Sequence, residues 1–312
     1  MWNTANPNAT KKAAELLEYL NETAGKGLIT GQHTQTNASE EIAYIRGLTG
    51  REPKLRGFEL LSYSPNINYS DADAACLTEV YENRGTVDTA LEWAMNSNGI
   101  VTLSFHWFSP LGGRGKSFYA RNTDFDADKI LIENTPEREA FFRDMDVIAE
   151  QLKRFYDADI PVLWRPFHES DGDWFWWGAK GAKTARELYK LMLEYYTKIK
   201  KLNNLLWVWN CRLKEGYPGD EYVDVISVDI YLEKYAPTDY RAEYERLVAE
   251  TTARKVAALA EVGYIPDIDI IAGSKVPWAY FMSWSKEFII GGQYNSAERV
   301  KALYNNDYSI VL

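Results

Sequence analysis

The segment Arg165–Glu169, which reads R-P-F-H-E, brings a guanidinium, an imidazole and a carboxylic acid together within five residues. It follows an apolar run at 160–164, as at the end of a buried strand, and aromatic residues fill 174–177. Flat indole faces beside an acid suit a sugar ring, whose axial C–H bonds pack on aromatic planes while its hydroxyls bind polar groups. The alternative is an aromatic loop packed on the domain rim, with Glu169 simply paired to Arg165.

A second carboxylate, Glu261, ends the small-residue run V-A-A-L-A-E-V-G, which can seat it deep in a cavity. Cleavage of a glycosidic bond needs one acid to protonate the leaving oxygen and one carboxylate to attack the anomeric carbon. A separation of about 5–5.5 Å implies retained configuration, and about 6.5–9.5 Å implies inversion. We expect the shorter separation between Glu169 and Glu261, with a raised pKa for the acid. The alternative for Glu261 is a salt-bridged residue at a strand end.

The elements that must position these residues follow a βα alternation, which is typical of a parallel sheet. Eight apolar runs predict strands at Leu28–Thr34, Leu55–Tyr63, Ile100–Trp107, Pro161–Glu169, Leu205–Cys211, Val223–Tyr231, Val256–Gly263 and Trp278–Ser285. Helical patterns lie between them at Val87–Ser97, Pro136–Tyr156, Ala182–Lys201, Tyr240–Lys255 and Ala297–Tyr304, after a first helix capped by Asn8 or Thr10. We therefore predict a single-domain (β/α)8 TIM barrel spanning 1–312, with irregular segments at 64–85 and 108–135.

Polar side chains gather at one end of the predicted strands. The residues concerned are Gln32, His33, His106, Trp107, His168, Glu169, Asp229, Tyr231, Glu261 and Trp284. All three histidines of the chain are among them. Because the C-terminal strand ends of a barrel converge on one cavity, we expect these side chains to form a site there. With about 31 residues for each barrel unit, Glu169 and Glu261 fall on the fourth and seventh strands and face each other.

The composition limits the partners of the chain. Its formal net charge is −10, and no Lys/Arg block is longer than a pair, so neither nucleic acid nor an anionic membrane surface is expected. No run of about 18 apolar residues or signal-peptide pattern occurs, which predicts a soluble chain. The 11 Trp and 21 Tyr exceed what a core needs, so some lie on surfaces. Whether Cys76 and Cys211 pair cannot be read from their positions.

These motifs resemble glycoside hydrolase family 26, whose members are mainly β-mannanases. The likeness rests on R-P-F-H-E followed by G-D-W-F-W-W-G, on F-H-W in the third strand, on Y-P-G-D-E-Y-V-D-V-I-S-V-D-I-Y at the sixth, and on Glu261. The resemblance covers the third to eighth strands. Relatives in the wider retaining clan carry Asn before the acid, whereas this chain carries His168, which points to family 26.

The resemblance implies a role for each matching residue. Glu169 would be the general acid/base and Glu261 the nucleophile. Around them, the substrate-binding residues would be His106, Trp107, His168, Trp174, Asp229, Tyr231 and Trp284, with Arg165 in support. Some mannanases of the family have an Arg after the eighth-strand Trp, whereas this chain has Ser285. The resemblance therefore does not determine the specificity of the distal subsite. The resemblance also implies a secreted or cell-envelope enzyme, and we expect a monomer without metal or cofactor that acts on a polysaccharide.

Other readings of the sequence were weighed. The run G-G-R-G-K-S at Gly112–Ser117 is similar to a phosphate-binding loop, but Pro110 stands where that motif needs Gly. A metal-dependent hydrolase would need more than three histidines, and an H-x-H pair is missing. A catalytically inactive carbohydrate-binding barrel would not need both carboxylates. Within the family, β-1,4-mannan is the expected polymer, and β-1,3-xylan and mixed-linkage β-glucan are alternatives.

Overall fold

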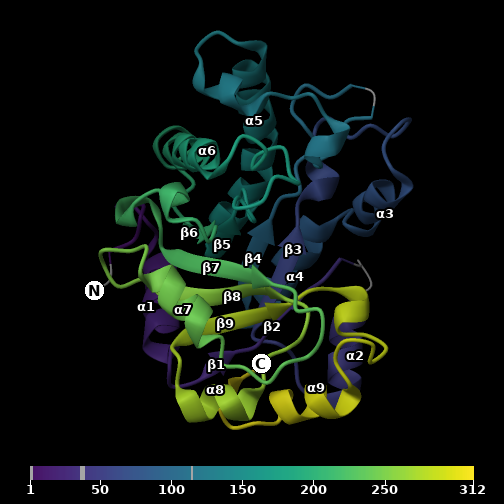
Figure 1. Ribbon diagram of the computed structural model, residues 1–312, viewed down its shortest axis with the longest axis vertical. Helices are drawn as coiled ribbons and strands as arrows, with labels where there is room; N and C mark the ends of the chain where they lie inside the picture. The colour runs from purple at the N-terminus through teal and green to yellow at the C-terminus, as the bar shows by residue number, and fades with distance from the viewer. Residues whose placement is uncertain (1–2, 36–38, 114) are drawn as a thin grey trace.

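A closed barrel of parallel strands organises the computed structural model, which describes residues 3–35, 39–113 and 115–312 (Figure 1). The strands are β1 Leu28–Ile29, β2 Gly31–His33, β3 Leu55–Glu59, β4 Ile100–Ser104, β5 Val162–Arg165, β6 Leu205–Asn210, β7 Val225–Ile230, β8 Val256–Val262, β9 Trp278–Ser283 and β10 Ser309–Ile310. Strands β2 to β9 pair in chain order, and β9 closes the barrel by pairing with both β8 and β2. The predicted (β/α)8 TIM barrel is confirmed.

The predicted first strand, 28–34, is divided into β1 and β2. Thr30, between them, donates its backbone N–H to the carbonyl of Ile310, and β1 pairs with β10. Beyond the break, a Cβ added at Gly31 would lie 2.2 Å from the carbonyl oxygen of Phe281. Glycine is therefore required for β2 to approach β9 so closely.

Helices surround the barrel in the expected alternation, with some differences in position (Figure 1). They are α1 Lys11–Thr23, α2 Glu40–Thr49, α3 Ala74–Glu82, α4 Thr86–Asn96, α5 Pro136–Asp157, α6 Ala182–Glu194, α7 Arg241–Val248, α8 Ile268–Ser274 and α9 Ala297–Tyr304. Thr10 is the cap of α1, since its hydroxyl accepts the N–H of Ala13. The segment 64–85, expected to be irregular, contains α3, whose N-terminus is capped by Asp73.

The remaining helix predictions differ mainly in length. The predicted helix 240–255 is shorter, because α7 ends at Val248, and α6 passes into a π-helical turn at Tyr195–Ile199. Helices α2 and α8 lie in segments for which no helix was predicted. In the run 112–117, Arg114 lies outside the described residues.

Two apolar layers hold the barrel together. Side chains such as Leu55, Leu163 and Val225 fill its interior, and a larger cluster, including Trp164 and Phe141, lies between the strands and the helices. Burial of this kind stabilises a fold by about 25 cal/mol for each Å² of apolar surface. The packed interior makes the strands a rigid frame for side chains at their ends. Among the described residues, none of the helices combines the length and apolar character that crossing a bilayer would require.

Candidate active site

A cavity of about 330 Å³ lies at the C-terminal ends of the barrel strands. Its lining residues are Gln35, Glu79, His106, Phe118, Tyr119, His168, Glu169, Trp174, Phe175, Tyr231, Glu261 and Trp284. The predicted site residues that line it are His106, His168, Glu169, Trp174, Tyr231, Glu261 and Trp284. Segments far apart in the chain therefore meet in one polar hollow with aromatic walls.

An unusual backbone turn presents Glu169 to this cavity. Strand β5 ends at Arg165, and both Phe167 (φ 51°) and Glu169 (φ 54°) adopt left-handed conformations. Such residues cost about 1–3 kcal/mol each and persist only where the surroundings hold them. Asn210, at the end of β6, supplies such support, because its Oδ1 accepts the backbone N–H of Glu169 at 2.7 Å. The backbone strain therefore coincides with an acid whose position is fixed by a hydrogen bond.

A β-bulge turns Glu261 toward the same cavity. Val256 and Ala258 of β8 point into the barrel interior, so strict alternation would place Glu261 on the outside. The pairing with β7 shifts, however, so that Val228 opposes Leu259 and Asp229 opposes Glu261. One extra residue in β8 therefore moves Glu261 to the inner face beside Asp229.

The carboxylates meet closely at the barrel mouth. One oxygen each from Glu169, Asp229 and Glu261 lies within 4.8 Å of the other two. Trp174 donates its indole N–H to Oε2 of Glu169, and Tyr231 donates its hydroxyl to Oε2 of Glu261, both at 2.7 Å. These oxygens of Glu169 and Glu261 lie closer together than the separation of about 6.5–9.5 Å that leaves room for an intervening water.

The environment of Glu169 favours its protonated form. Burial is the main cause, and the nearby Asp229 carboxylate adds to it, so that the pKa of Glu169 is raised to about 7. The hydrogen bond from Trp174 opposes this rise, because it stabilises the charged carboxylate. An acid with a pKa near neutrality can both donate and accept a proton in one catalytic cycle.

Arg165 lies beneath the other two carboxylates. Its side chain is 1% exposed and forms ion pairs with Asp229, at 2.8 Å, and with Glu261. Burial opposes its charge, but the two carboxylates outweigh burial and raise the pKa of Arg165. Burial also raises the pKa of Glu261 and that of Asp229, the latter to about 7, while Arg165 opposes both rises. One cation is thus shared by two acids.

Glu59, a residue that sequence reasoning missed, fixes the charge of His106. Its carboxylate accepts the backbone N–H of His106 at 2.7 Å and lies 2.8 Å from Nδ1 of the same ring. Burial alone would lower the pKa of His106, but Glu59 reverses this and raises it to about 9. Burial likewise opposes the charge of Glu59, yet His106 lowers the pKa of that carboxyl to about 2. The pair is therefore ionised near neutral pH.

The other two histidines are neutral. Nε2 of His168 lies 3.1 Å from Nε2 of His106, and burial together with Arg165 lowers the pKa of His168 well below its usual range. Protonated His106 is therefore the donor and His168 the acceptor. Burial also lowers the pKa of His33, to about 3. Its ring stacks on Trp284 with 3.9 Å between centroids and 7° between planes, which holds that indole at the cavity wall.

Trp107, predicted to bind substrate, does not line the cavity. Its side chain is 1% exposed, and its indole N–H is donated to Oδ2 of Asp144 at 2.8 Å. The ring packs against Phe141 and Trp176 outside the barrel. Neighbouring residues along an extended chain point to opposite sides, so His106 faces the cavity and Trp107 faces away. The structure thus places Trp107 in the core, where it supports the loop that carries His106.

Several cavity residues gave little or no sequence signal. Glu59 and Asn210 lie beneath the cavity rather than in its lining, and they come from within apolar strand runs, which gave no sign of their role. Gln35 and Glu79 come from loop and helix segments after β2 and β3. The others are Phe118 and Tyr119, which come from a loop, whereas Phe175 lies in the aromatic stretch 174–177 that the sequence had singled out.

Of the carboxylates that the structure describes, Glu169, Asp229 and Glu261 form a cluster whose spacing could hold a metal ion. Arg165 already occupies the inner side of this cluster with a buried positive charge, and a cation placed beside it would be repelled. The donor set therefore fits a guanidinium better than a metal. Cys76 and Cys211 are both free and buried, so they do not pair.

A parallel barrel whose mouth holds two facing carboxylates between aromatic walls defines a barrel of the glycoside hydrolase class. The comparison with protein families agrees: the chain belongs to glycosyl hydrolase family 26, which matches residues 5–311. The resemblance noted from the sequence motifs is thereby confirmed.

Mannanases are among the relatives that match most of this chain. A mannan endo-1,4-beta-mannosidase of Thermothelomyces thermophilus is 36% identical over 98% of this chain and 62% of its own length. Mannan endo-1,4-beta-mannosidase B of a Piromyces species is 30% identical over 96% of this chain and 51% of its own length. This chain thus spans about half to two thirds of these relatives.

Solved structures show the same architecture. A Podospora anserina beta-(1,4)-mannanase is 35% identical, with a TM-score of 0.87 over 99% of this chain and 68% of that one. A beta-mannanase from a symbiotic protist of the termite Reticulitermes speratus, in complex with a gluco-manno-oligosaccharide, is 30% identical, with a TM-score of 0.86 over 100% of this chain and 98% of that one.

Proposed function

We propose that this chain is a retaining glycoside hydrolase of the endo-β-1,4-mannanase type, which cleaves β-1,4-mannosidic bonds in mannan, galactomannan and glucomannan. The observation that carries the proposal is the approach of Glu169 and Glu261 within 4.8 Å at the barrel mouth. This spacing fits double displacement through a covalent intermediate. The names of the relatives support mannan as the polymer.

In the first step, the carboxylate of Glu261 attacks the anomeric carbon as the bond from that carbon to the glycosidic oxygen breaks. Glu169 gives its proton to the departing oxygen, so the leaving sugar departs as a neutral alcohol. The product is a glycosyl ester on Glu261 with inverted configuration. Arg165 and the Tyr231 hydroxyl favour the ionised form of the nucleophile before attack.

In the second step, Glu169 is a carboxylate and takes a proton from a water molecule. The resulting hydroxide character allows that water to attack the same carbon and to break the ester bond to Glu261. The configuration inverts again, so the overall result is retention. A pKa near 7 suits Glu169 for both directions of proton transfer.

The residues around the carboxylates would bind the sugar. Hydroxyl-2 of mannose is axial and moves toward the ring plane as the ring distorts, so His106 and His168 can bind the distorted ring more tightly than the ground state. Trp284 offers an aromatic wall held by His33, and Trp174, which is 42% exposed, offers one beside the acid. Asp229 orients Arg165.

The polymer is tested by product analysis on mannan, galactomannan, glucomannan, β-1,3-xylan and lichenan in parallel. Our proposal predicts the highest kcat/KM on the mannans and a ladder of oligomers from the start of the reaction. Sole release of mannobiose would mean action from a chain end. Preferred cleavage of β-1,3-xylan or lichenan would overturn the choice of polymer, and no cleavage of any of them would favour an inactive binding barrel.

We also infer that one chain is sufficient for activity and that it meets its substrate outside the cytoplasm. One chain carries both carboxylates and the aromatic walls that the proposed reaction uses. A polymer cannot cross a membrane intact, which favours a secreted or envelope location. Light scattering during chromatography should give the mass of one chain, and a stable dimer would contradict the first inference.

A further inference from the structure

Glu79 is an acidic residue of the carboxylate cavity for which the proposed mechanism has no role. It lies on α3, three residues after Cys76 and directly before Val80, and both of these neighbours are buried in the core. Their packing fixes the orientation of the helix. Glu79 itself is half-buried and lines the cavity together with His106.

A second contact holds α3 against the segment that follows β9. Glu82, the last residue of α3, forms an ion pair with Lys286, which lies two residues after Trp284 of the cavity wall. The backbone N–H of Lys286 is in turn donated to Oε1 of Glu41 at 3.1 Å. The helix that carries Glu79 is therefore attached on two sides, and its position does not depend on Glu79 itself.

The carboxylate of Glu79 has no protein partner. Within the described part of the chain, it takes part in neither a hydrogen bond nor an ion pair. Burial raises its pKa, the charge of His106 opposes that rise, and the charge of Glu59 adds to it. An acid in this position loses part of its hydration without a compensating bond, which is unfavourable for the folded protein.

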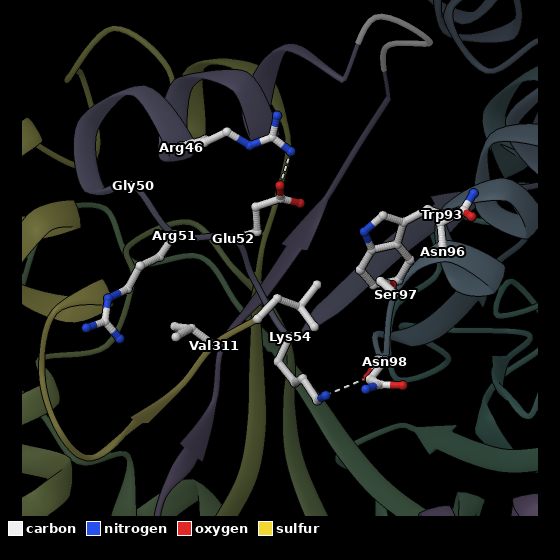
Figure 2. Close-up of a pocket in the computed structure, with 11 residues that line it drawn as sticks. Arg46, Gly50, Arg51, Glu52, Lys54, Trp93, Asn96, Ser97, Asn98 and Val311 are labelled. Atoms are coloured by element: carbon white, nitrogen blue, oxygen red, sulfur yellow. Dashed lines mark hydrogen bonds and ion pairs between the residues drawn. The ribbon is translucent and has the colours of Figure 1, made fainter.

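A cavity at the other end of the barrel treats its acid differently (Figure 2). It has a volume of about 620 Å³ and lies just before β3 and β4, at the N-terminal strand ends. Its one acidic side chain, Glu52, is paired with Arg46, and Arg51 and Lys54 also line it. There the protein supplies the partner of the acid, whereas the partner of Glu79 can come only from water or from a ligand.

We propose that Glu79 is a specificity-determining residue, which binds a free hydroxyl group of the polysaccharide and disfavours chains whose hydroxyls are O-acetylated. An ionised carboxylate only accepts hydrogen bonds, and the donors that a neutral sugar brings are its hydroxyls. An acetyl ester has no donor and adds bulk, so it would leave the carboxylate desolvated and unpaired. A site built to bind a hydroxyl rejects analogues that lack it strongly. The inference rests on the proposed function, because it assumes a polysaccharide in the cavity.

The test compares an acetylated galactoglucomannan with the same polymer after mild alkaline deacetylation, by measuring kcat/KM on each. We expect the unaltered chain to prefer the deacetylated polymer. Glu79→Ala should lower kcat/KM on the deacetylated polymer about tenfold, as expected for the loss of one hydrogen bond to a charged group, and should lower it much less on the acetylated polymer. Glu79→Gln keeps an acceptor oxygen and should keep more of the preference than Glu79→Ala.

Glu92→Ala is the matched control, because Glu92 is an exposed acid on α4 that does not line the cavity. It should leave the preference unchanged. Glu79→Ala should not lower the melting temperature, whereas a merely structural role would lower it and slow cleavage of both polymers alike. An unchanged preference in Glu79→Ala, an equal loss on both polymers, or an equal change in Glu92→Ala would each overturn the inference. Failure of the unaltered chain to cleave either polymer would instead overturn the proposed function on which it rests.

Discussion

At the C-terminal end of the barrel, the charged groups are buried and bonded to one another, whereas at the N-terminal end they lie near the surface and form at most isolated pairs. Arg165 and Glu59 are both about 1% exposed, and each binds a neighbouring ionisable group: Arg165 binds Asp229, and Glu59 binds His106. Arg51, by contrast, is exposed. The same residue types therefore have different consequences at the two ends.

The difference teaches where pKa values can be tuned. In a desolvated network, each charge changes the ionisation of its neighbours, as seen for Glu169, His106 and Asp229. On the solvated surface, water and salt screen most of that influence. Substitutions at the mouth should therefore change several properties together, and substitutions at the other end should change one.

The largest effect is expected for Glu169→Ala, which removes the proposed acid/base. Hydrolysis of mannan should fall by about 10²–10⁴-fold, because the leaving oxygen is no longer protonated. An aryl mannoside with a good leaving group should lose much less in its first step, since it needs little protonation. Burst kinetics on both substrates would check this. An equal loss on both would contradict the role of Glu169 as the acid.

Arg165→Met should cause the next largest change, because it leaves Asp229 and Glu261 buried without their cation. Loss of one partner of a buried ion pair costs about 3–5 kcal/mol in the free energy of unfolding. The pKa values of both carboxyls are raised, so these acids take up protons as the pH falls and then need no cation beside them. The loss in the free energy of unfolding should therefore be smaller at pH 5 than at pH 8. Urea unfolding at both pH values measures it, and a pH-independent loss would contradict the network.

Glu59→Gln should have an intermediate effect, because Glu59 binds the imidazole of His106. Without the carboxylate, burial dominates, and the pKa of His106 should fall from about 9 to below its usual value. The charge of His106 contributes stability that is present below pH 6.5 and is lost as the pH rises through about 9. NMR titration of the ring should show this shift together with a lower kcat. An unchanged His106 titration would break the proposed link.

Trp174→Phe should have the smallest effect, a shift in the pH profile. The indole N–H lowers the pKa of Glu169 by stabilising its carboxylate, so its removal should raise that pKa above about 7. Because the acid must be protonated, the basic limb of kcat/KM should move to higher pH. Ser170→Ala, next to the acid but without a bond to its carboxylate, is a control that should leave the limb in place. A shift to lower pH would contradict this account.

The barrel and its two acids could be predicted because each rests on a local pattern. An apolar run that ends in a polar cluster revealed Glu169, and the position of Glu261 followed from the repeat of βα units. The bulge that turns Glu261 inward, and the inward side of β3 that carries Glu59, depend on strand pairing, which the sequence does not display. Helix α3 was missed because the segment just before it, which contains two Asn and two Asp residues, has the composition of a loop.

Trp107 shows the limit of the pattern most clearly. It follows His106 directly, and both match the same motif, yet opposite sides of the extended chain send one into the cavity and the other into the core. Residue type alone could not separate them, whereas the alternation of side chains beyond β4 does.

The central claim is that Glu261 is the nucleophile facing the acid Glu169, and its most direct test is Glu261→Ala with azide. We predict that the substitution abolishes mannan hydrolysis, and that azide restores turnover of an aryl β-mannoside by giving the α-mannosyl azide, because the small anion enters the space of the lost carboxylate. Full activity of Glu261→Ala, or a rescued product of retained configuration, would contradict the account.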